Sequence, residues 1–282
     1  IVSKQIIFTF KLGIKTCSAT DLTSYIPSRQ RVHRVLSVPA FGILYLFTAL
    51  MVLAGLPFLY MRIKPVVRSM MRFWARGIFF LLGKKIEVKG RENIRNTNRY
   101  ILIANHSSLF DIVAIVSVIP DIAWFGHERL MKIPVFRQVL VLTDYIPMRK
   151  TTVRNTKEML NELQARSRNR NIAIFPEGTR TTNGKINDFY RGFIILLRTT
   201  SINIVPVTLN GFFRFKPKIR SYIDFSAHLQ MVIHRPIESD ELVNLTDSEI
   251  VSKVRQIIES ALVEDHSIPL EEIKMNPQII EK

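Results

Sequence analysis

Two short stretches of the chain carry side chains whose types and spacing suit proton transfer. In ANHSSLFD, residues 104–111, His106 and Asp111 are separated by four residues. Imidazole has a pKa of about 6.5, so it is the side chain best matched to removing a proton from a hydroxyl group at neutral pH. A carboxylate on the other ring nitrogen fixes the tautomer and stabilises the imidazolium that forms. We therefore expect His106 to act as a general base and Asp111 to orient it.

The second stretch, FPEGTR at residues 175–180, suits the binding of anions. Gly178 permits close backbone approach, so its amide or a neighbouring amide is a candidate donor to an oxyanion. Arg180 offers a forked set of donors that fits a phosphate group. Two roles stay open for Glu177, which either orders the histidine and arginine or contacts a substrate hydroxyl. A structural ion pair is the alternative to both.

Each stretch follows a strand-like run, YILIAN before His106 and NIAIF before Pro176. After Lys84 such runs alternate with helix-like segments, which predicts an α/β domain with a mixed, largely parallel sheet flanked by helices. The runs begin near residues 86, 100, 122, 144, 171 and 203, and the helices lie at about 109–119, 128–141, 153–168 and 190–200. A polar helix follows Asp240, with a capping box at Thr246 and Glu249. Because open α/β sheets bind ligands at the carboxyl ends of strands, both stretches should share one edge.

The N-terminal part of the chain has a different character. Residues 35–61 form a run of 27 residues without a charge, which is a membrane-segment candidate, with a buried core helix as the alternative. A second segment, residues 66–83, carries Arg68, Arg72 and Arg76 on one helical face, a pattern suited to the lipid headgroup boundary or to an ordinary solvated face. Basic residues flank the uncharged run on both sides, so neither end is assigned outward. We predict a membrane-embedded helical hairpin in residues 1–83, mainly in one leaflet with both ends cytoplasmic, and an α/β domain in residues 84–282.

Composition limits the partners. The 40 Lys and Arg residues exceed the 23 Asp and Glu residues, for a net charge of +17, which favours nucleic acid, an anionic membrane or a phosphorylated small substrate. A nucleic-acid-binding protein would explain the charge but not the uncharged run, and the sequence has no helix-turn-helix, zinc-finger or RNA-binding signature. We expect no nucleic-acid partner. Cys17 is the single cysteine and the histidines form no HExxH pattern, so we expect no disulfide and no metal, in a reducing compartment.

Taken together, NHSSLFD and FPEGTR resemble the hallmark motifs of the glycerophosphate acyltransferase superfamily, most closely those of the 1-acylglycerol-3-phosphate acyltransferases. The resemblance covers roughly residues 85–235. Two weaker blocks are also similar. TDYIPMRK matches the family's second block at Arg149, although Thr143 replaces the usual glycine and Met148 the common acidic residue, and NIVPVTLNG matches the fourth block around Pro206.

The resemblance implies a membrane enzyme that transfers a fatty acyl group from a thioester to the 2-hydroxyl of lysophosphatidate, giving phosphatidate, with its active site facing the cytoplasm. The acyl donor, acyl-CoA or acyl carrier protein, is a co-substrate, and no other cofactor is expected. His106 and Asp111 would be catalytic, and the substrate would be bound by Arg149, Glu177, Gly178, Thr179, Arg180 and the weaker candidate Lys132. Glycerol 3-phosphate, another lysophospholipid or a lyso-aminolipid are the alternative acceptors.

Two chemical schemes fit such a transfer. A thiol has a pKa of about 8.5, so the thiolate leaves without a strong general acid, and direct attack by the acceptor hydroxyl is the simpler scheme. A covalent acyl-serine at Ser107 or Ser108 is the competing scheme. Adjacent residues rarely direct their reactive atoms at each other, and helix capping is the other role open to both serines.

Overall fold

The computed structural model describes residues 19–95, 99–119, 122–132, 136–148, 170–190 and 202–263, and residues 161, 165, 193, 194, 197 and 198. Arg149 and most of the two helices expected at 153–168 and 190–200 lie outside these residues.

In the described part of the chain, seven strands form one sheet in the order β1-β7-β6-β2-β5-β3-β4. All neighbouring pairs are parallel except β6 and β7. This arrangement confirms the predicted mixed, largely parallel sheet. The strands are β1 (Ile86–Lys89), β2 (Tyr100–Ala104), β3 (Ile122–His127), β4 (Ile146–Met148), β5 (Asn171–Ile174), β6 (Asn203–Asn210) and β7 (Leu229–Ile233).

Sequence reasoning missed β7, which lies between β1 and β6. Its only signal is a short alternation in which Leu229, Met231 and Ile233 are buried while Gln230 and Val232 are partly exposed. Val232 is itself apolar, so the period of two that marks a half-buried strand is weak in the sequence.

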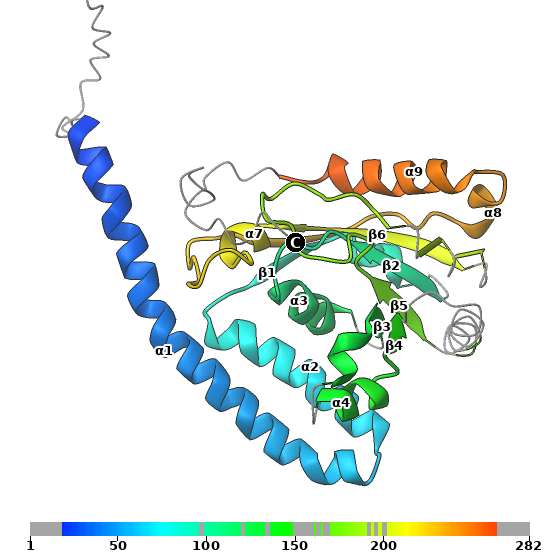
Figure 1. Cartoon of the computed structure of the whole chain (residues 1–282), viewed down its shortest axis with the longest axis horizontal. Coiled ribbons are helices and arrows are strands. Elements are labelled where there is room, and N and C mark those ends of the chain that lie inside the picture. Colours follow the sequence, from blue (N-terminus) through cyan, green and yellow to red (C-terminus); the bar gives the residue numbers. More distant parts are fainter. Residues whose placement is uncertain are drawn as a thin grey trace, which may run out of the picture.

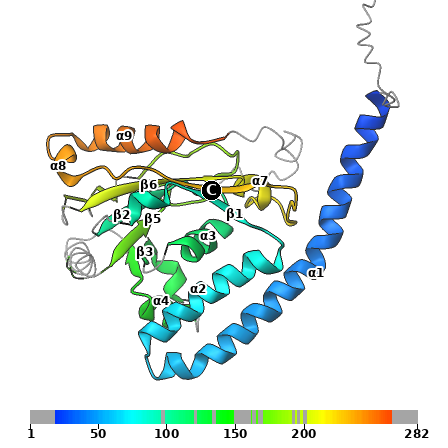
Figure 2. The same ribbon diagram turned by 180° about the vertical axis from the view of Figure 1, so that it is seen from behind.

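Helices cover both faces of the sheet (Figures 1 and 2). On β2, Leu102 and Ala104 point into the apolar cluster with α3, while Ile101 and Ile103 belong to the cluster with α9. A strand that is covered on both faces reads as a continuous apolar run, which is why YILIA lacks polar alternation. One face carries α2 (Lys64–Leu81), α3 (Phe110–Val118) and α4 (Phe136–Leu142), and the other carries α8 (Ser239–Leu242) and α9 (Asp247–Ser260). Short turns are η1 (Arg91–Ile94), η2 (Glu128–Lys132) and α7 (Phe212–Phe215).

The predicted capping box at the start of α9 is confirmed. The Thr246 hydroxyl accepts the Glu249 N–H, and the Glu249 carboxylate accepts the Thr246 N–H. These two bonds satisfy donors that the first turn of a helix otherwise leaves without partners.

At the N-terminal end, α1 (Ala19–Tyr60) and α2 form a helical hairpin (Figure 1). The two helices pack closely, because a Cβ atom on Gly77 would lie 2.5 Å from Cζ of Phe47. Within the described residues, Gln30–Tyr60 is the one helix long and apolar enough to cross a membrane, and 11% of its most apolar window is buried. The segment is therefore not a buried core helix.

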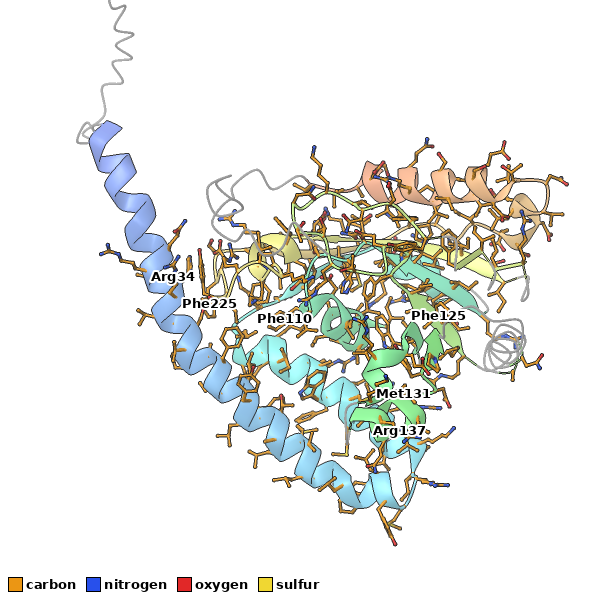
Figure 3. All side chains as sticks on the ribbon, viewed as in Figure 1. Arg34, Phe110, Phe125, Met131, Arg137 and Phe225 are labelled. Carbon is orange, nitrogen blue, oxygen red and sulfur yellow. The ribbon has the colours of Figure 1, made fainter. Side chains whose placement is uncertain are left out.

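A polar contact also fixes α1 against the α/β domain. Ser37 accepts the Ile223 N–H at 2.8 Å, and the Arg34 guanidinium lies over the Tyr222 ring, 5.3 Å from its centroid. Arg34 and Phe225 are seen side by side in Figure 3. The connection between α7 and β7 therefore rests on the middle of α1.

The arginine face of α2 is turned differently from the expectation. Arg68 bonds to Asp144, and Arg76 donates to the carbonyl of Ser117, so these side chains turn toward the α/β domain and not toward a lipid boundary. Large apolar side chains on the other side of α2, Phe73 and Phe80, are exposed instead. Helical periodicity correctly predicted that the arginines share one face of α2, but it did not predict which part of the molecule that face meets. Because α2 also buries side chains against α3, the proposed domain division after residue 83 stays a prediction.

Candidate active site

The pairing of β2 with β5 brings the two motifs together. Ile103 of β2 is level with Ile174 of β5 in a parallel pair, so His106 and Glu177 each follow three residues later. The His106 N–H donates to Oε1 of Glu177 at 2.6 Å, and the Thr181 N–H donates to the His106 carbonyl at 2.9 Å. The motifs share one edge of the sheet, as the sequence predicted.

His106 and Asp111 form a hydrogen-bonded pair. Nδ1 of His106 lies 2.9 Å from Oδ2 of Asp111, and the same oxygen accepts the N–H groups of Ser107 and Ser108 at 2.7 Å. Asp111 is fully buried in the first turn of α3. An ionised carboxylate only accepts hydrogen bonds, so we assign the proton to Nδ1, which leaves a lone pair on Nε2. With 13% of its side chain exposed, His106 is placed to act as a base.

Aromatic rings hold the plane of the imidazole. The His106 ring stacks on Phe175 with centroids 4.0 Å apart, and Phe175 stacks on Trp124 at 5.5 Å. Sequence reasoning quoted Phe175 only as part of FPEGTR and gave it no role. No spacing rule predicts a ring contact between residues on two different strands.

Glu177 fixes the backbone on both sides of the site. It is 1% exposed, and its oxygens accept the N–H groups of His106 and Asn187 at 2.6 and 2.8 Å. Burial raises the pKa of Glu177 to about 7, and the two N–H donors oppose that shift. Glu177 forms no ion pair with a described residue. Of the roles considered, ordering of the histidine is the one that these contacts support.

The Gly178 amide was one of two expected oxyanion donors, and a neighbouring amide was the other. Gly178 has a φ of 65°, and its own N–H donates to the carbonyl of Phe175 at 3.1 Å, so that N–H is occupied and does not face a ligand. The amides of Thr179 and Arg180 make no hydrogen bond to a described residue and remain the candidate oxyanion donors. The Tyr190 ring packs on Gly178, where a Cβ atom would lie 3.1 Å from it.

Positive charge gathers beside the His106–Asp111 pair. Burial lowers the pKa of Arg180, and the charge of Asp111 raises it, so these two groups lie within electrostatic range. Burial, then the charges of Arg180 and Arg220, lower the pKa of Lys216. Lys216 reaches this edge because the next residue, Pro217, forms a bridge with Ser108. Sequence reasoning missed Lys216, whose only signal is the basic run KPKIR.

Two further cations were predicted to bind the substrate. Lys132 is exposed on η2 and makes no hydrogen bond or ion pair with a described residue. Arg149 lies outside the described residues. Substrate-binding roles for both stay predictions.

Both serines of the first motif are buried. Ser108 donates to the Lys216 carbonyl at 2.7 Å and accepts the Phe110 N–H at 3.3 Å, at the start of α3. Ser107 Oγ has no hydrogen-bond partner among the described residues. Among the described residues, no contact of Ser108 or Ser107 supplies a base that would activate the serine as a nucleophile. The described residues also contain no group of three or more His, Cys, Asp or Glu side chains that could hold a metal ion.

Comparison with known proteins finds similar sequences. A family model described as acyltransferase matches residues 85–210. The chloroplastic 1-acyl-sn-glycerol-3-phosphate acyltransferase of Arabidopsis thaliana is 24% identical over 76% of this chain, which spans 62% of that protein's length. A 1-acyl-sn-glycerol-3-phosphate acyltransferase of Borreliella burgdorferi is 28% identical over 67% of this chain and 79% of its own.

The fold has a solved counterpart. The crystal structure of a 1-acyl-sn-glycerophosphate acyltransferase from Thermotoga maritima matches with a TM-score of 0.67 at 22% identity, covering 88% of this chain and 98% of that one. The residues matched by the acyltransferase family model, 85–210, include the His106–Asp111 pair and the FPEGTR loop on one sheet edge.

Proposed function

We propose that the chain transfers a fatty acyl group from an acyl thioester to the 2-hydroxyl of 1-acylglycerol 3-phosphate, producing phosphatidate. The observation that carries this proposal is the His106–Asp111 hydrogen bond beside the half-buried cations Arg180 and Lys216. A base next to a cationic site suits an acceptor that has both a hydroxyl and a phosphate group. The names of the Arabidopsis and Borreliella relatives support the same acceptor.

In the proposed reaction His106 acts directly on the acceptor. Nε2 removes the hydroxyl proton as the oxygen attacks the thioester carbonyl, while Nδ1 keeps its bond to Asp111. The buried carboxylate stabilises the imidazolium. The tetrahedral intermediate then collapses and expels the thiolate, which needs no strong acid because a thiol has a pKa of about 8.5.

Binding groups come from the loops on either side of His106. The amides of Thr179 and Arg180, which have no acceptor among the described residues, are the proposed donors to the oxyanion. The Arg180 guanidinium, with Lys216 beside it, is the proposed clamp on the acceptor phosphate. Glu177 and Thr181 keep this loop in register with His106, because each is hydrogen-bonded to its backbone.

An acyl-transfer assay on the purified full chain tests the proposal. The acceptors are lysophosphatidate, glycerol 3-phosphate and lysophosphatidylcholine, each offered with acyl-CoA and with acyl carrier protein thioester. We expect phosphatidate, identified by product mass, as the main product with at least one donor. Faster acylation of an acceptor other than lysophosphatidate would contradict the proposed substrate.

The hairpin of α1 and α2 is the proposed membrane attachment, embedded mainly in one leaflet with the active site on the cytoplasmic side. Leu46, Leu50 and Leu53 support it, because each is more than half exposed on α1. Changing Leu46 and Leu50 together to Glu should release the protein from vesicles in a flotation assay, since each charge in lipid costs roughly 2.5 to 3.5 kcal/mol. Gln256→Glu on the exposed side of α9 is the matched control.

Orientation needs a separate measurement. In a Cys17→Ser background, Ser252→Cys on α9 should react with an impermeant maleimide only from the cytoplasmic side of sealed vesicles. Labelling from the opposite side would overturn the proposed orientation, whatever the flotation result.

A further inference from the structure

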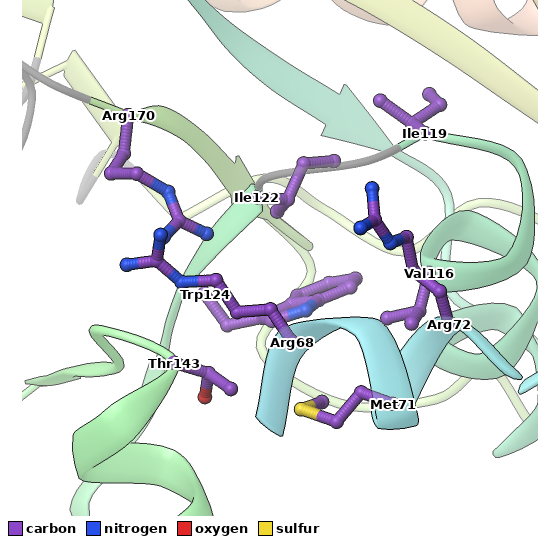
Figure 4. Close-up of a pocket in the computed structure, with 9 residues that line it drawn as sticks. All are labelled: Arg68, Met71, Arg72, Val116, Ile119, Ile122, Trp124, Thr143 and Arg170. Carbon is purple, nitrogen blue, oxygen red and sulfur yellow. The ribbon is translucent and has the colours of Figure 1, made fainter. Parts of the chain in front are cut away.

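A pocket lies on the same face of the sheet as α2 and α3, at the opposite end from His106. It lies between α2 and the starts of two strands, since Ile122 begins β3 and Arg170 immediately precedes β5 (Figure 4). His106, in contrast, follows the carboxyl end of β2, which runs parallel to β5. None of the acyl-transfer chemistry described above uses this pocket.

Three guanidinium groups, those of Arg68, Arg72 and Arg170, border the pocket (Figure 4). Arg170 is 8% exposed, so a formal positive charge is almost completely buried there. Asp144 is the acidic partner, and its carboxylate lies 2.6 Å from Arg68 and 3.2 Å from Arg170, with Lys64 at 2.9 Å. Although burial raises the pKa of Asp144, these cations hold it below its ordinary value.

Two arginines on the wall formed by α2 carry donors without an acceptor among the described residues. Nε of Arg68 is buried and has no such partner, because Asp144 is bonded to the terminal nitrogen of the same guanidinium. Arg72, one turn further along α2, makes no hydrogen bond or ion pair with any residue that the structure describes. Buried donors are rarely left unpaired in proteins, so Nε of Arg68 indicates a missing acceptor, and an oxyanion is the acceptor that guanidinium groups prefer. Arg72 is partly exposed and borders the same pocket.

The rest of the pocket is apolar. Ile119, Ile122 and Trp124 are each less than 10% exposed and line the pocket between and beside the arginines (Figure 4). A small, strongly hydrated anion gains nothing from such a lining, whereas the first methylene groups of an alkyl chain bury apolar surface against it. The neighbouring hairpin, with its exposed apolar side chains, would bring membrane-borne amphiphiles close to this site.

We propose that this pocket binds the oxyanion head, a phosphate or carboxylate, of a single-chain amphiphile. Arg72 and Nε of Arg68 donate to the head, and the first part of the chain lies along Ile119, Ile122 and Trp124. The site is separate from the catalytic edge and does not depend on the acyl-transfer proposal.

The fluorescence emission of Trp124 reports binding in this pocket. The chain has two tryptophans, so Trp74→Phe leaves Trp124 as the sole indole reporter. The full chain in this background, held in neutral phosphatidylcholine nanodiscs, is titrated with dodecyl phosphate, and we expect a saturable change in emission. Inorganic phosphate and uncharged dodecyl maltoside are the comparison ligands. Equal affinity for inorganic phosphate would assign the site to a free anion, and equal affinity for the maltoside would overturn the role of the arginines.

Two arginines of the same helix provide the matched variants. Arg72→Gln should weaken dodecyl phosphate binding about tenfold or more, and Arg72→Lys less, because lysine keeps the charge but loses the forked donors. Arg76→Gln should leave it unchanged, because Arg76 bonds to the Ser117 carbonyl outside the pocket. Unchanged binding in Arg72→Gln would overturn the proposal.

A third variant separates this pocket from the catalytic edge. Trp124 stacks on Phe175, which stacks on His106, so a ligand bound beside His106 would also change Trp124 emission. The Arg180→Gln variant should therefore keep the dodecyl phosphate response. Loss of the response in Arg180→Gln would place the ligand at the catalytic edge and refute a second site. Acyl transfer is not the readout, so failure of the proposed reaction leaves this test intact.

Discussion

The two ends of the sheet differ in how their charged groups are paired. At the carboxyl end, Oδ2 of Asp111 accepts three N–H donors and both oxygens of Glu177 accept backbone amides. At the amino end, Arg68 and Arg72 carry donors without acceptors among the described residues. Oδ1 of Asp111 and Oγ of Ser107 are also buried at the carboxyl end without a partner among the described residues, but the reactive imidazole itself is held in place before any ligand binds. The donors at the amino end are completed only by a ligand. Preorganisation of this kind is what acid–base catalysis requires, whereas a binding pocket tolerates unpaired donors.

His106→Ala is expected to impair catalysis at the carboxyl end of the sheet most severely. Loss of a general base lowers the rate by about 10²- to 10⁴-fold, and we expect a kcat decrease in this range with little change in lysolipid binding. The exposed His228, which bonds to Glu87, is the matched control, and His228→Ala should retain full activity. Substantial acyl transfer by His106→Ala would contradict the base assignment.

This end of the sheet was largely predictable, because each motif is contiguous and directly follows a strand. Parallel pairing of β2 and β5 then places His106 beside Glu177 without further information. The capping box of α9 is local in the same way, since Thr246 and Glu249 are three residues apart. Chemistry that depends on short spacing and on strand ends can be read from one sequence.

The other end was not predictable. Its pocket joins side chains of α2, β3 and the residue before β5, which are separated by up to about a hundred positions in the chain. The same limit explains why Lys216 and the ring contact of Phe175 were missed, and why the arginines of α2 were expected at a lipid headgroup boundary or on a solvated face. The use of the Gly178 amide in a turn was also beyond a spacing rule, because it depends on the local φ of 65°.

The protonation of Glu177 is a second property of the catalytic end that can be tested. Its pKa is raised from 4.5 to about 7, so in the folded protein it keeps its proton at pH values where the unfolded chain has lost it. The raised pKa of Glu177 therefore stabilises the folded state in full below pH 4.5. This contribution to the free energy of unfolding, roughly 3 kcal/mol, is lost as the pH rises to about 7. Melting temperatures of the wild type should fall over this range, and Glu177→Gln should remove that part of the slope. The same slope in both proteins would show that Glu177 is ionised throughout.

The cationic side of the catalytic end is tested by Arg180→Gln. Loss of a charge-assisted hydrogen bond to phosphate costs roughly 1.5 to 3 kcal/mol, so KM for lysophosphatidate should rise about 10- to 100-fold. KM for monoacylglycerol, which has no phosphate, serves as the internal control and should not change. An equal rise for both acceptors would indicate a structural role for Arg180 in place of a phosphate clamp.

The smallest effect is expected at the amino end, from Asp144→Asn. Asp144 has a φ of 60°, a conformation that asparagine also tolerates, so the substitution removes the charge and little else. Three cations then lose their shared carboxylate, and because Lys64 and Arg68 are partly exposed, the free energy of unfolding should fall by only about 1 to 2 kcal/mol. The pKa of Asp144 lies below its ordinary value of 3.8, so the difference between wild type and variant should be full above pH 3.8 and shrink below it. Glu259→Gln, which breaks an exposed pair with Arg255, is the matched control and should change the stability by less than about 1 kcal/mol.

Asp144→Asn also removes one acid beside Arg68 and Arg170, so dodecyl phosphate should bind the pocket more tightly while kcat at the other end of the sheet stays unchanged. A parallel loss of dodecyl phosphate binding and of kcat would show that the two ends of the sheet do not act independently.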